Sequence, residues 1–418
     1  MSDTPHNTAA QLWRVRIPLI LTAAAVYILT PRFTGEVFKT GGRFPPFAAA
    51  FLEGRLSVET ATAPLDVLEE LIPRPDGKRL FLAYPPLPAI LMMPFVALLG
   101  VGAVTTQLAC RVVSVVNVAV FDLCVVRAAK LLGRPPPTPI ARAALGLFFA
   151  FGTATWHNAQ FGGDWHYAHA VALAAMLAGT AEHCGRRRPT VVGACIAAAL
   201  LTRPTAALCG VFFLMPWVRS RDYLSLSRAL MPIGAGGLML AVYNAARFGD
   251  PLDFGYSRML LTGMGERLMA QYGQFHPHFI PRNAFWFFLA PPWIATEPVL
   301  RLTYDPRGLS LFLASPALIY AFVSLRAPHR QVGLRDAWFA MALCLLPLLS
   351  YFNSGFWQFG HRFALDYLPI LLLLMMAGMS PRPSRTTYIL MAMSVAMQTW
   401  GVLIAIPAPL PAWLAPAP

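Results

Sequence analysis

The feature that most constrains this chain is a series of about eleven apolar segments separated by short polar breaks. A bilayer hydrocarbon core is about 30 Å thick and takes roughly 20 apolar residues per helix. Hydrophobic residues make up 57% of the 418-residue chain and charged residues only 12%, whereas an ordinary soluble domain is roughly 25% charged. The sequence therefore predicts one all-α, polytopic transmembrane helical bundle over residues 1–418, with no large soluble domain.

Clusters of Lys and Arg in short loops mark the cytoplasmic side of a membrane protein. Such clusters lie at 14–16, 127–142, 186–188, 219–228, 326–335 and 382–385. They predict a cytoplasmic N-terminus in the plasma (inner) membrane, an external C-terminus, and eleven crossings. The expected crossings are about 17–30, 106–127, 143–157, 166–183, 190–203, 204–218, 229–247, 308–325, 336–352, 366–380 and 387–407. The first has the basic flank of a signal peptide but no small-residue cleavage site, so we expect a retained helix.

This topology leaves two large external loops. The first, 31–105, contains the short proline-rich run YPPLPAILMMP, which predicts an interfacial helix at 85–100. The second, 248–307, contains the aromatic run AFWFFLAPPWI and predicts another interfacial helix at 284–294, because Trp and Phe favour the headgroup region. The six cysteines lack the paired spacing of a disulfide framework or a zinc site, and we expect them to be small core residues.

Ionisable residues near membrane depth are energetically costly, so each of them indicates a possible functional role. The stretch GGDWHYAH (162–169) carries Asp164, His166 and His169 at the outer end of an expected helix. Asp164 is a candidate catalytic carboxylate or only a helix cap. The two histidines, three residues apart on one helix face, are expected to be satisfied locally rather than to bind a metal.

Three further polar stretches have alternative interpretations. Arg203, before Pro204, either marks a turn or binds a phosphate, for which a guanidinium fork is well shaped. GFWQFGHRFALDYLP (355–369) holds His361, Arg362 and Asp366. Arg362 and Asp366 either pair at i,i+4 or bind substrate, and Trp357 belongs either to the aromatic belt or to a sugar-stacking surface. In the first loop Glu36, Lys39 and Arg43 are solvated charges on their own, but the topology brings them to the same external face.

No Walker motif, nucleotide-binding Gly-rich turn, HExxH or GxSxG is present. The order of the segments along the chain nevertheless resembles the order found in one protein family. A first helix is followed by AAAFLEGRL, GKRLFLAYPPLPAILMMPF, a helix with an early Arg111, an external acidic residue, RRRPTVVGACIAAALLTRPTA and GHRFALDYLPILLLL. This resembles the polytopic glycosyltransferases that use lipid-phosphate-linked sugars, such as protein O-mannosyltransferases and lipid A aminoarabinose transferases, and is closest to uncharacterised bacterial members.

The resemblance implies a catalytic carboxylate early in the first loop and a second acid in the next external loop. Asp164 matches the second position. The first position falls at Thr40 to Gly42, where the sequence has TGG, and Glu36 is the nearest substitute. The family often has a lysine before its two prolines to meet the donor phosphate; here Tyr84 stands there, and Lys78, Arg79 or Arg203 are the available replacements.

Together these features predict an enzyme that transfers a sugar from a polyprenyl-phosphate-linked donor to an acceptor hydroxyl on the outer face. Asp164 and Glu36 are the catalytic candidates. The expected substrate-binding residues are Lys39, Arg43, Tyr84, His166, Arg203, Trp357, His361, Arg362 and Asp366. A divalent metal is possible, the expected partners are the sugar lipid and membrane lipids, and no nucleic acid is expected. Two alternatives remain open: a transporter or lipid flippase with a polar path through the bilayer, and a non-catalytic lipid-binding relative.

Overall fold

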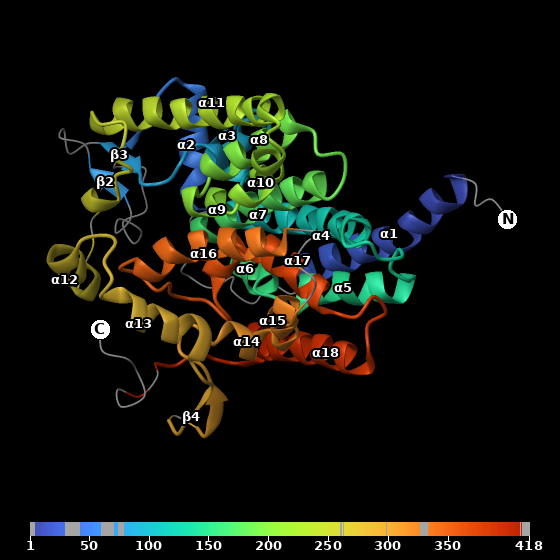
Figure 1. The fold of residues 1–418 in the computed structure, drawn as a ribbon. Helices are drawn as coiled ribbons and strands as arrows, with labels where there is room; N and C mark the ends of the chain where they lie inside the picture. The colour runs from blue at the N-terminus through green and yellow to red at the C-terminus, as the bar shows by residue number, and fades with distance from the viewer. Residues whose placement is uncertain are drawn as a thin grey trace.

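The computed structural model describes residues 5–29, 42–59, 71–73, 79–259, 261, 263–297, 299–326, 333–409 and 411. Within them the chain is mostly helical, as predicted. Figure 1 shows α11, α4, α1, α5 and α18 running in roughly one direction, with β2, β3 and α12 gathered at one end of the bundle and the start of α1 at the other. The longer helices are α1 (Pro5–Leu29), α4 (Thr106–Leu131), α5 (Pro139–Phe151), α7 (Asp164–His183), α8 (Pro189–Leu200), α11 (Tyr223–Phe248), α16 (Leu334–Ser350), α17 (Leu368–Gly378) and α18 (Arg385–Thr399).

Three helical stretches of the described residues are long and apolar enough to cross a membrane: Thr106–Leu131, Tyr223–Phe248 and Arg385–Ile404. Five shorter apolar helical stretches accompany them, at Leu87–Leu99, Pro139–Phe151, Pro189–Leu200, Pro316–Arg326 and Leu368–Gly378. The protein is therefore an integral membrane protein with apolar helices. The count of eleven crossings stays a prediction.

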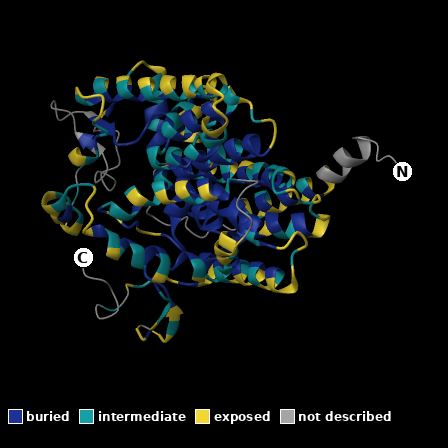
Figure 2. Ribbon diagram, viewed as in Figure 1, coloured by how far each residue is buried: buried dark blue, intermediate teal, exposed yellow. Residues whose placement is uncertain are grey.

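Helix α17 lies at the centre of the bundle. All its residues except the last, Gly378, are buried, and it packs against α7, α15 (Tyr320–Val323) and α16. Figure 2 shows this buried interior, whereas α11 and α18 carry exposed residues along their outer sides. Exposed apolar side chains on outer helices suit a protein whose surroundings are lipid. The six cysteines are free, and five of them are buried, as expected of small core residues.

Proline interrupts the helices at Pro204, the position that the sequence suggested. The expected crossings at 190–203 and 204–218 appear as α8, a short α9 (Pro204–Leu208) and α10 (Val211–Ser220). Arg203 has an extended backbone between α8 and α9 (φ −145°, ψ 99°), because proline disfavours a helical conformation of the residue before it.

The expected interfacial helix at 85–100 corresponds to α3 (Leu87–Leu99), which packs on α2 (Phe44–Leu52). Two small sheets were not predicted. One orders β1 (Val58–Glu59), β3 (Arg79–Leu82) and β2 (Leu71–Pro73), and the other pairs β4 (Trp293–Ala295) with β5 (Arg301–Thr303). The run at 284–294 is therefore helical only through α13 (Phe279–Ala284) and the π-helical turn Phe285–Leu289, and it ends in a strand.

The segment expected to cross at 308–325 is broken into short pieces. These are α14 (Leu311–Ala314), the 3₁₀ turn Pro316–Ile319, α15 and the 3₁₀ turn Ser324–Arg326. The helical ladder of α14 stops at Ser315, immediately before Pro316. Because proline lacks a backbone N–H, it cannot continue that ladder.

Buried ion pairs connect α1, α4 and α5. Asp122 of α4 accepts hydrogen bonds from Arg142 of α5 and from Arg16 of α1, at 2.7–3.0 Å. Such a pair is costly to break, because removing one partner leaves a buried charge uncompensated. It fixes α1, α4 and α5 relative to one another.

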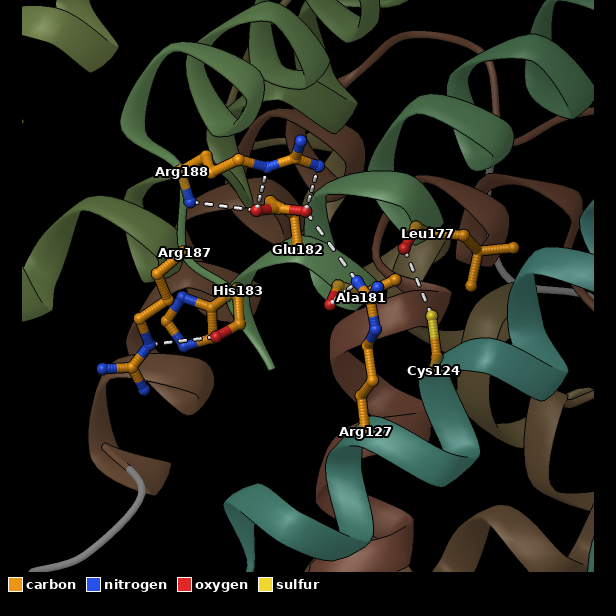
Figure 3. A network of polar contacts seen from close by, with 8 residues as sticks. All are labelled: Cys124, Arg127, Leu177, Ala181, Glu182, His183, Arg187 and Arg188. Atoms are coloured by element: carbon orange, nitrogen blue, oxygen red, sulfur yellow. Dashed lines mark hydrogen bonds and ion pairs between the residues drawn. The ribbon is translucent and has the colours of Figure 1, made fainter. Parts of the chain in front are cut away.

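A second network closes the C-terminal end of α7 (Figure 3). Glu182 accepts from Arg188 Nε and Nη2 at 2.9 and 3.0 Å, and Arg127 of α4 donates to the Ala181 carbonyl oxygen at 2.8 Å. Arg187 donates to the His183 carbonyl oxygen at 2.9 Å. Cations that bind the last carbonyls of a helix also complement its dipole, so this arginine cluster has a structural role.

Candidate functional site

A cavity of about 240 Å³ lies where α7, α9 and α16 come together; Figure 1 shows these three helices side by side. Of the residues predicted to bind substrate, Tyr84, Arg203 and Arg362 line this cavity. The rest of its described lining is mostly aromatic or polar: Trp165, Thr202, Pro204, Thr205, Phe254, Tyr256, Met259, Gln274, Phe275, Pro347, Leu348, Tyr351, Asn353 and Phe363. An apolar hollow with a few convergent polar groups is the usual form of a small-molecule site.

Arg203 is held by an acid from the other half of the chain. Its Nε donates to Asp366 Oδ1 at 2.7 Å and its Nη2 donates to Asp366 Oδ2 at 3.0 Å. This two-pronged geometry matches the planar guanidinium to the carboxylate. The carboxylate of Asp366 is fully buried, while the Arg203 side chain keeps 15% of its surface exposed.

Two further groups complete the coordination of Asp366. Thr205 Oγ1 donates to Oδ2 at 2.6 Å, and His169 Nδ1 lies 3.0 Å from Oδ1. Each oxygen of Asp366 thus has two protein partners. Asp366 was predicted to bind substrate, but in the structure it neutralises and orients Arg203.

Arg362 approaches the cavity from the 3₁₀ turn Arg362–Asp366. Its guanidinium carbon lies 4.9 Å from the centroid of the Trp165 ring and 5.2 Å from that of Phe363, and Nη1 donates to the Phe356 carbonyl oxygen at 2.5 Å. The carboxylate of Asp366, four residues on, is turned to Arg203. A 3₁₀ turn has three residues per turn, so residues i and i+4 do not lie one above the other as they do in an α-helix.

Asp164 connects two segments that are far apart in the sequence. It is the first residue of α7, whose N-cap is Gly163 with no side-chain cap bond. Asp164 Oδ1 accepts from the Arg43 backbone N–H at 2.9 Å and from Thr106 Oγ1 at 3.2 Å, and Oδ2 lies 3.7 Å from Arg43 Nη1. The interpretation of Asp164 as only a cap of its own helix is therefore wrong, since its partners come from α4 and from the segment before α2.

The backbone at Gly42 makes this contact possible. Gly42 has φ +89°, and a Cβ there would lie 2.1 Å from Thr106 Oγ1 and 3.0 Å from Asp164 Oδ1. Only glycine combines this positive φ with so close an approach. Arg43, with 9% of its side chain exposed, is thus held against α7 as part of the site's framework rather than in the cavity lining.

The predicted histidines are buried. His166 is fully buried, with its ring centroid 4.5 Å from that of Phe161, and His361 is fully buried with Nδ1 3.4 Å from Gln358 Nε2. Burial, reinforced by the neighbouring Arg362 guanidinium, lowers the pKa of His361 well below its usual value. Its ring is therefore neutral and packs as a polar core group.

The remaining predicted residues lie elsewhere. Trp357, 39% exposed, stacks on Phe161 with ring centroids 6.3 Å apart, next to the cavity wall rather than in it. Glu36, Lys39 and Lys78 lie outside the described residues, and of Arg79 only the backbone is described. Within the part of the chain that the structure describes, no three His, Cys, Asp or Glu side chains are placed to hold a metal ion.

Sequence reasoning missed several lining residues. Trp165 sits inside GGDWHYAH, so an aromatic beside the acid was a visible signal. Gln274 and Asn353 had no such signal, because they meet through backbone pairing of two distant segments: an isolated bridge joins Phe275 to Tyr351, and the Phe352 N–H donates to the Gln274 carbonyl oxygen at 3.0 Å.

No protein-family model and no curated protein sequence matches this chain. Among solved structures, it is similar to ArnT from Cupriavidus metallidurans bound to undecaprenyl phosphate, at 15% sequence identity and a TM-score of 0.47. The match covers 87% of this chain and 59% of ArnT, so the chain spans about three fifths of the length of that protein.

Proposed function

We propose that this protein is a membrane glycosyltransferase that moves a sugar from a polyprenyl-phosphate-linked donor to an acceptor hydroxyl. The observation that carries the proposal is the convergence of Arg203 and Arg362, 159 residues apart in the numbering, on one aromatic-walled cavity in a bundle of apolar helices. Two guanidinium groups suit a phosphate, and aromatic rings suit a sugar and the start of a lipid chain.

The two arginines have different roles in this proposal. Arg203 directs Nε and Nη2 to Asp366, which leaves Nη1 for a ligand in the cavity. Arg362 adds a second cation, held over the Trp165 ring. As the bond between the anomeric carbon and the phosphate oxygen breaks, charge builds up on the departing polyprenyl phosphate, and preoriented cations stabilise it.

The proton of the acceptor hydroxyl needs a base. Asp164 Oδ1 already accepts two hydrogen bonds, and Oδ2 faces the Arg43 guanidinium. These contacts indicate that the carboxylate of Asp164 orders the segment at 42–43. We therefore assign the base to Glu36, which precedes that segment, and assign Asp164 to positioning it. General-base help of this kind contributes roughly 10²–10⁴-fold in rate.

The reaction is assigned to the outer face of the membrane, on the distribution of Lys and Arg in the loops. The donor's polyprenyl chain would lie among the apolar helices, with its phosphate at the two arginines and its sugar against the aromatic wall. The acceptor is an alcohol of a lipid or protein exposed on the same face.

The test is a reconstitution. The purified protein in lipid nanodiscs is supplied with polyprenyl-phosphate sugars labelled in the sugar, together with a membrane extract as a pool of acceptors. Transfer of label to an acceptor with release of polyprenyl phosphate supports the proposal. If a folded protein transfers no label but carries the intact donor across proteoliposome membranes, the protein is a flippase and the proposal is wrong.

A further inference from the structure

The turn between α7 and α8 carries three consecutive arginines, Arg186, Arg187 and Arg188. It lies beside the C-terminal end of α4, where Arg127 donates to the Ala181 carbonyl oxygen at 2.8 Å. Two segments of the chain therefore bring four guanidinium groups to one end of the bundle, the end predicted to be cytoplasmic. None of the four belongs to the described lining of the cavity.

The backbone of this arginine turn, residues 185–188, is fixed by hydrogen bonds to the end of α7. The Gly185 and Arg187 N–H groups both donate to the Glu182 carbonyl oxygen, at 3.1 and 2.9 Å. Arg187 has φ +51°, a conformation that is uncommon for residues other than glycine. The chain therefore reverses within the run of arginines. Figure 3 shows the result: the Arg188 guanidinium lies against Glu182, whereas that of Arg187 points away from it.

Glu182 balances the charge of one of these arginines. Its carboxylate accepts from Nε and Nη2 of Arg188 at 2.9 and 3.0 Å, and from the Arg188 backbone N–H at 2.9 Å. Arg187 donates Nε–H to the carbonyl oxygen of His183, an uncharged group, and a guanidinium has four further N–H donors. Arg186 is exposed. The arginine turn thus presents cationic groups in addition to the one that Glu182 balances.

Apolar surface lies next to the arginine turn. Helix α8 begins directly after Arg188, and in its second turn a Cβ on Gly193 would lie 2.0 Å from the Ala229 carbonyl oxygen of α11. The next two residues of α11, Leu230 and Met231, are 46% and 69% exposed. In a bundle of apolar helices such side chains contact acyl chains. Cationic groups and lipid-facing side chains are therefore separated by less than about two turns of α8.

We infer that the arginine turn binds the phosphodiester headgroup of an anionic phospholipid, whose acyl chains lie along α8 and the start of α11. Guanidinium groups match phosphate oxygens in geometry and charge, and anionic lipids of the cytoplasmic leaflet attract basic segments at its surface. The fixed backbone holds the arginines in place before the lipid arrives, which lowers the entropic cost of binding. This site is separate from the cavity and does not depend on the proposed sugar transfer.

The test compares the lipids that bind to the full-length protein in a neutral detergent. Phosphatidylglycerol, which is anionic, and phosphatidylcholine with the same acyl chains are added at equal concentrations, and native mass spectrometry measures the two bound populations. We expect a preference for phosphatidylglycerol of roughly 25-fold, from about fivefold for each of two arginines. The double variant Arg186→Gln/Arg187→Gln should bind the two lipids almost equally. Equal binding by the unmodified protein, or an unchanged preference in the double variant, overturns the inference.

A matched control separates a local site from a general attraction. Arg382→Gln/Arg385→Gln removes two charges from exposed arginines of another loop on the predicted cytoplasmic side, and it should leave the preference within about twofold. Equal losses in the two double variants would indicate a diffuse surface potential and overturn the inference. Arg186→Gln alone changes one exposed side chain and should lower the preference about fivefold. It replaces the double variant if that protein has a lower unfolding midpoint.

A headgroup without acyl chains separates a lipid from a soluble anion. Glycerophosphoglycerol has the same phosphodiester as phosphatidylglycerol but no apolar part. We expect it to displace bound phosphatidylglycerol only at concentrations about 100-fold higher, because it gains nothing from the apolar side chains of α11. Displacement at equal concentration would make the occupant a soluble phosphodiester and overturn the assignment to a lipid.

Discussion

Arg203 and Asp366, 163 residues apart, form a bidentate ion pair in which the acid is fully buried and the arginine reaches the cavity. The pair joins the break between α8 and α9 to the turn before α17. The orientation of Arg203 is therefore set by a residue that lies immediately before α17, the buried central helix.

Asp366→Asn should therefore destabilise the protein and disturb the site. Loss of the carboxylate leaves the Arg203 charge without its partner, which costs about 3 kcal/mol when a buried pair is broken. We expect a lower midpoint of thermal unfolding in detergent and a raised KM for the donor. Asp253→Asn, which breaks the exposed pair with Arg258, is the control and should change neither measurement appreciably.

Gly42→Ala tests the close approach of residues 42–43 to α7. The added Cβ would meet Thr106 and Asp164, and the φ of +89° is itself strained for alanine. We expect a loss of about 1–3 kcal/mol in stability, or a displaced segment with reduced activity. Gly54→Ala separates the effect of backbone strain from the effect of the steric clash, because Gly54 has φ +70° but open space around its Cβ position. Equal effects of the two substitutions would contradict the account of the contact with Asp164.

The roles of the two acids can be separated by isosteric changes. Asp164→Asn keeps an oxygen to accept from the Arg43 N–H and from Thr106, so we expect a modest effect on kcat. Glu36→Gln removes the proposed base and should lower kcat by roughly 10²–10⁴-fold with little change in donor binding. A large loss of kcat in Asp164→Asn together with an active Glu36→Gln would reverse the assignment.

The buried neutral ring of His361 predicts a dependence of stability on pH. Its pKa is lowered on folding, so the unfolded chain, with a histidine pKa of about 6.5, binds a proton that the folded protein does not. Stability should therefore fall as the pH drops below about 6.5. His361→Asn should show a smaller fall in unfolding midpoint between pH 7.5 and 5.0 than the unmodified protein. His278→Asn, at an exposed histidine, should behave like the unmodified protein.

The sequence could predict the helical bundle because a bilayer imposes a length and an apolar composition on each segment. It could also predict the break at Arg203, since Pro204 acts on the residue before it. It did not predict the small sheets, because β1 to β3 are two to four residues long, too short for an alternating pattern.

The site was predictable only in part. Arg203 and Arg362 stood out as ionisable groups near membrane depth, and Tyr84 stood out through the family resemblance; all three line the cavity. The acids Asp366 and Asp164 were also singled out, but their contacts with Arg203 and Arg43 were not predicted, because each contact joins residues more than a hundred positions apart. Local spacing offered an Arg362–Asp366 pair and a helix cap at Asp164 as alternatives, whereas packing between distant segments gives both acids other partners.

The most direct test of the account is donor turnover by the unmodified protein and by Arg362→Gln, measured side by side in nanodiscs with a polyprenyl-phosphate sugar. The account predicts sugar transfer by the unmodified protein and a KM about 10–100-fold higher in the variant, because a charge-assisted contact to the phosphate is lost. Equal unfolding midpoints would show that both proteins are folded. No transfer by the folded unmodified protein, or an unchanged KM in the variant, would contradict it.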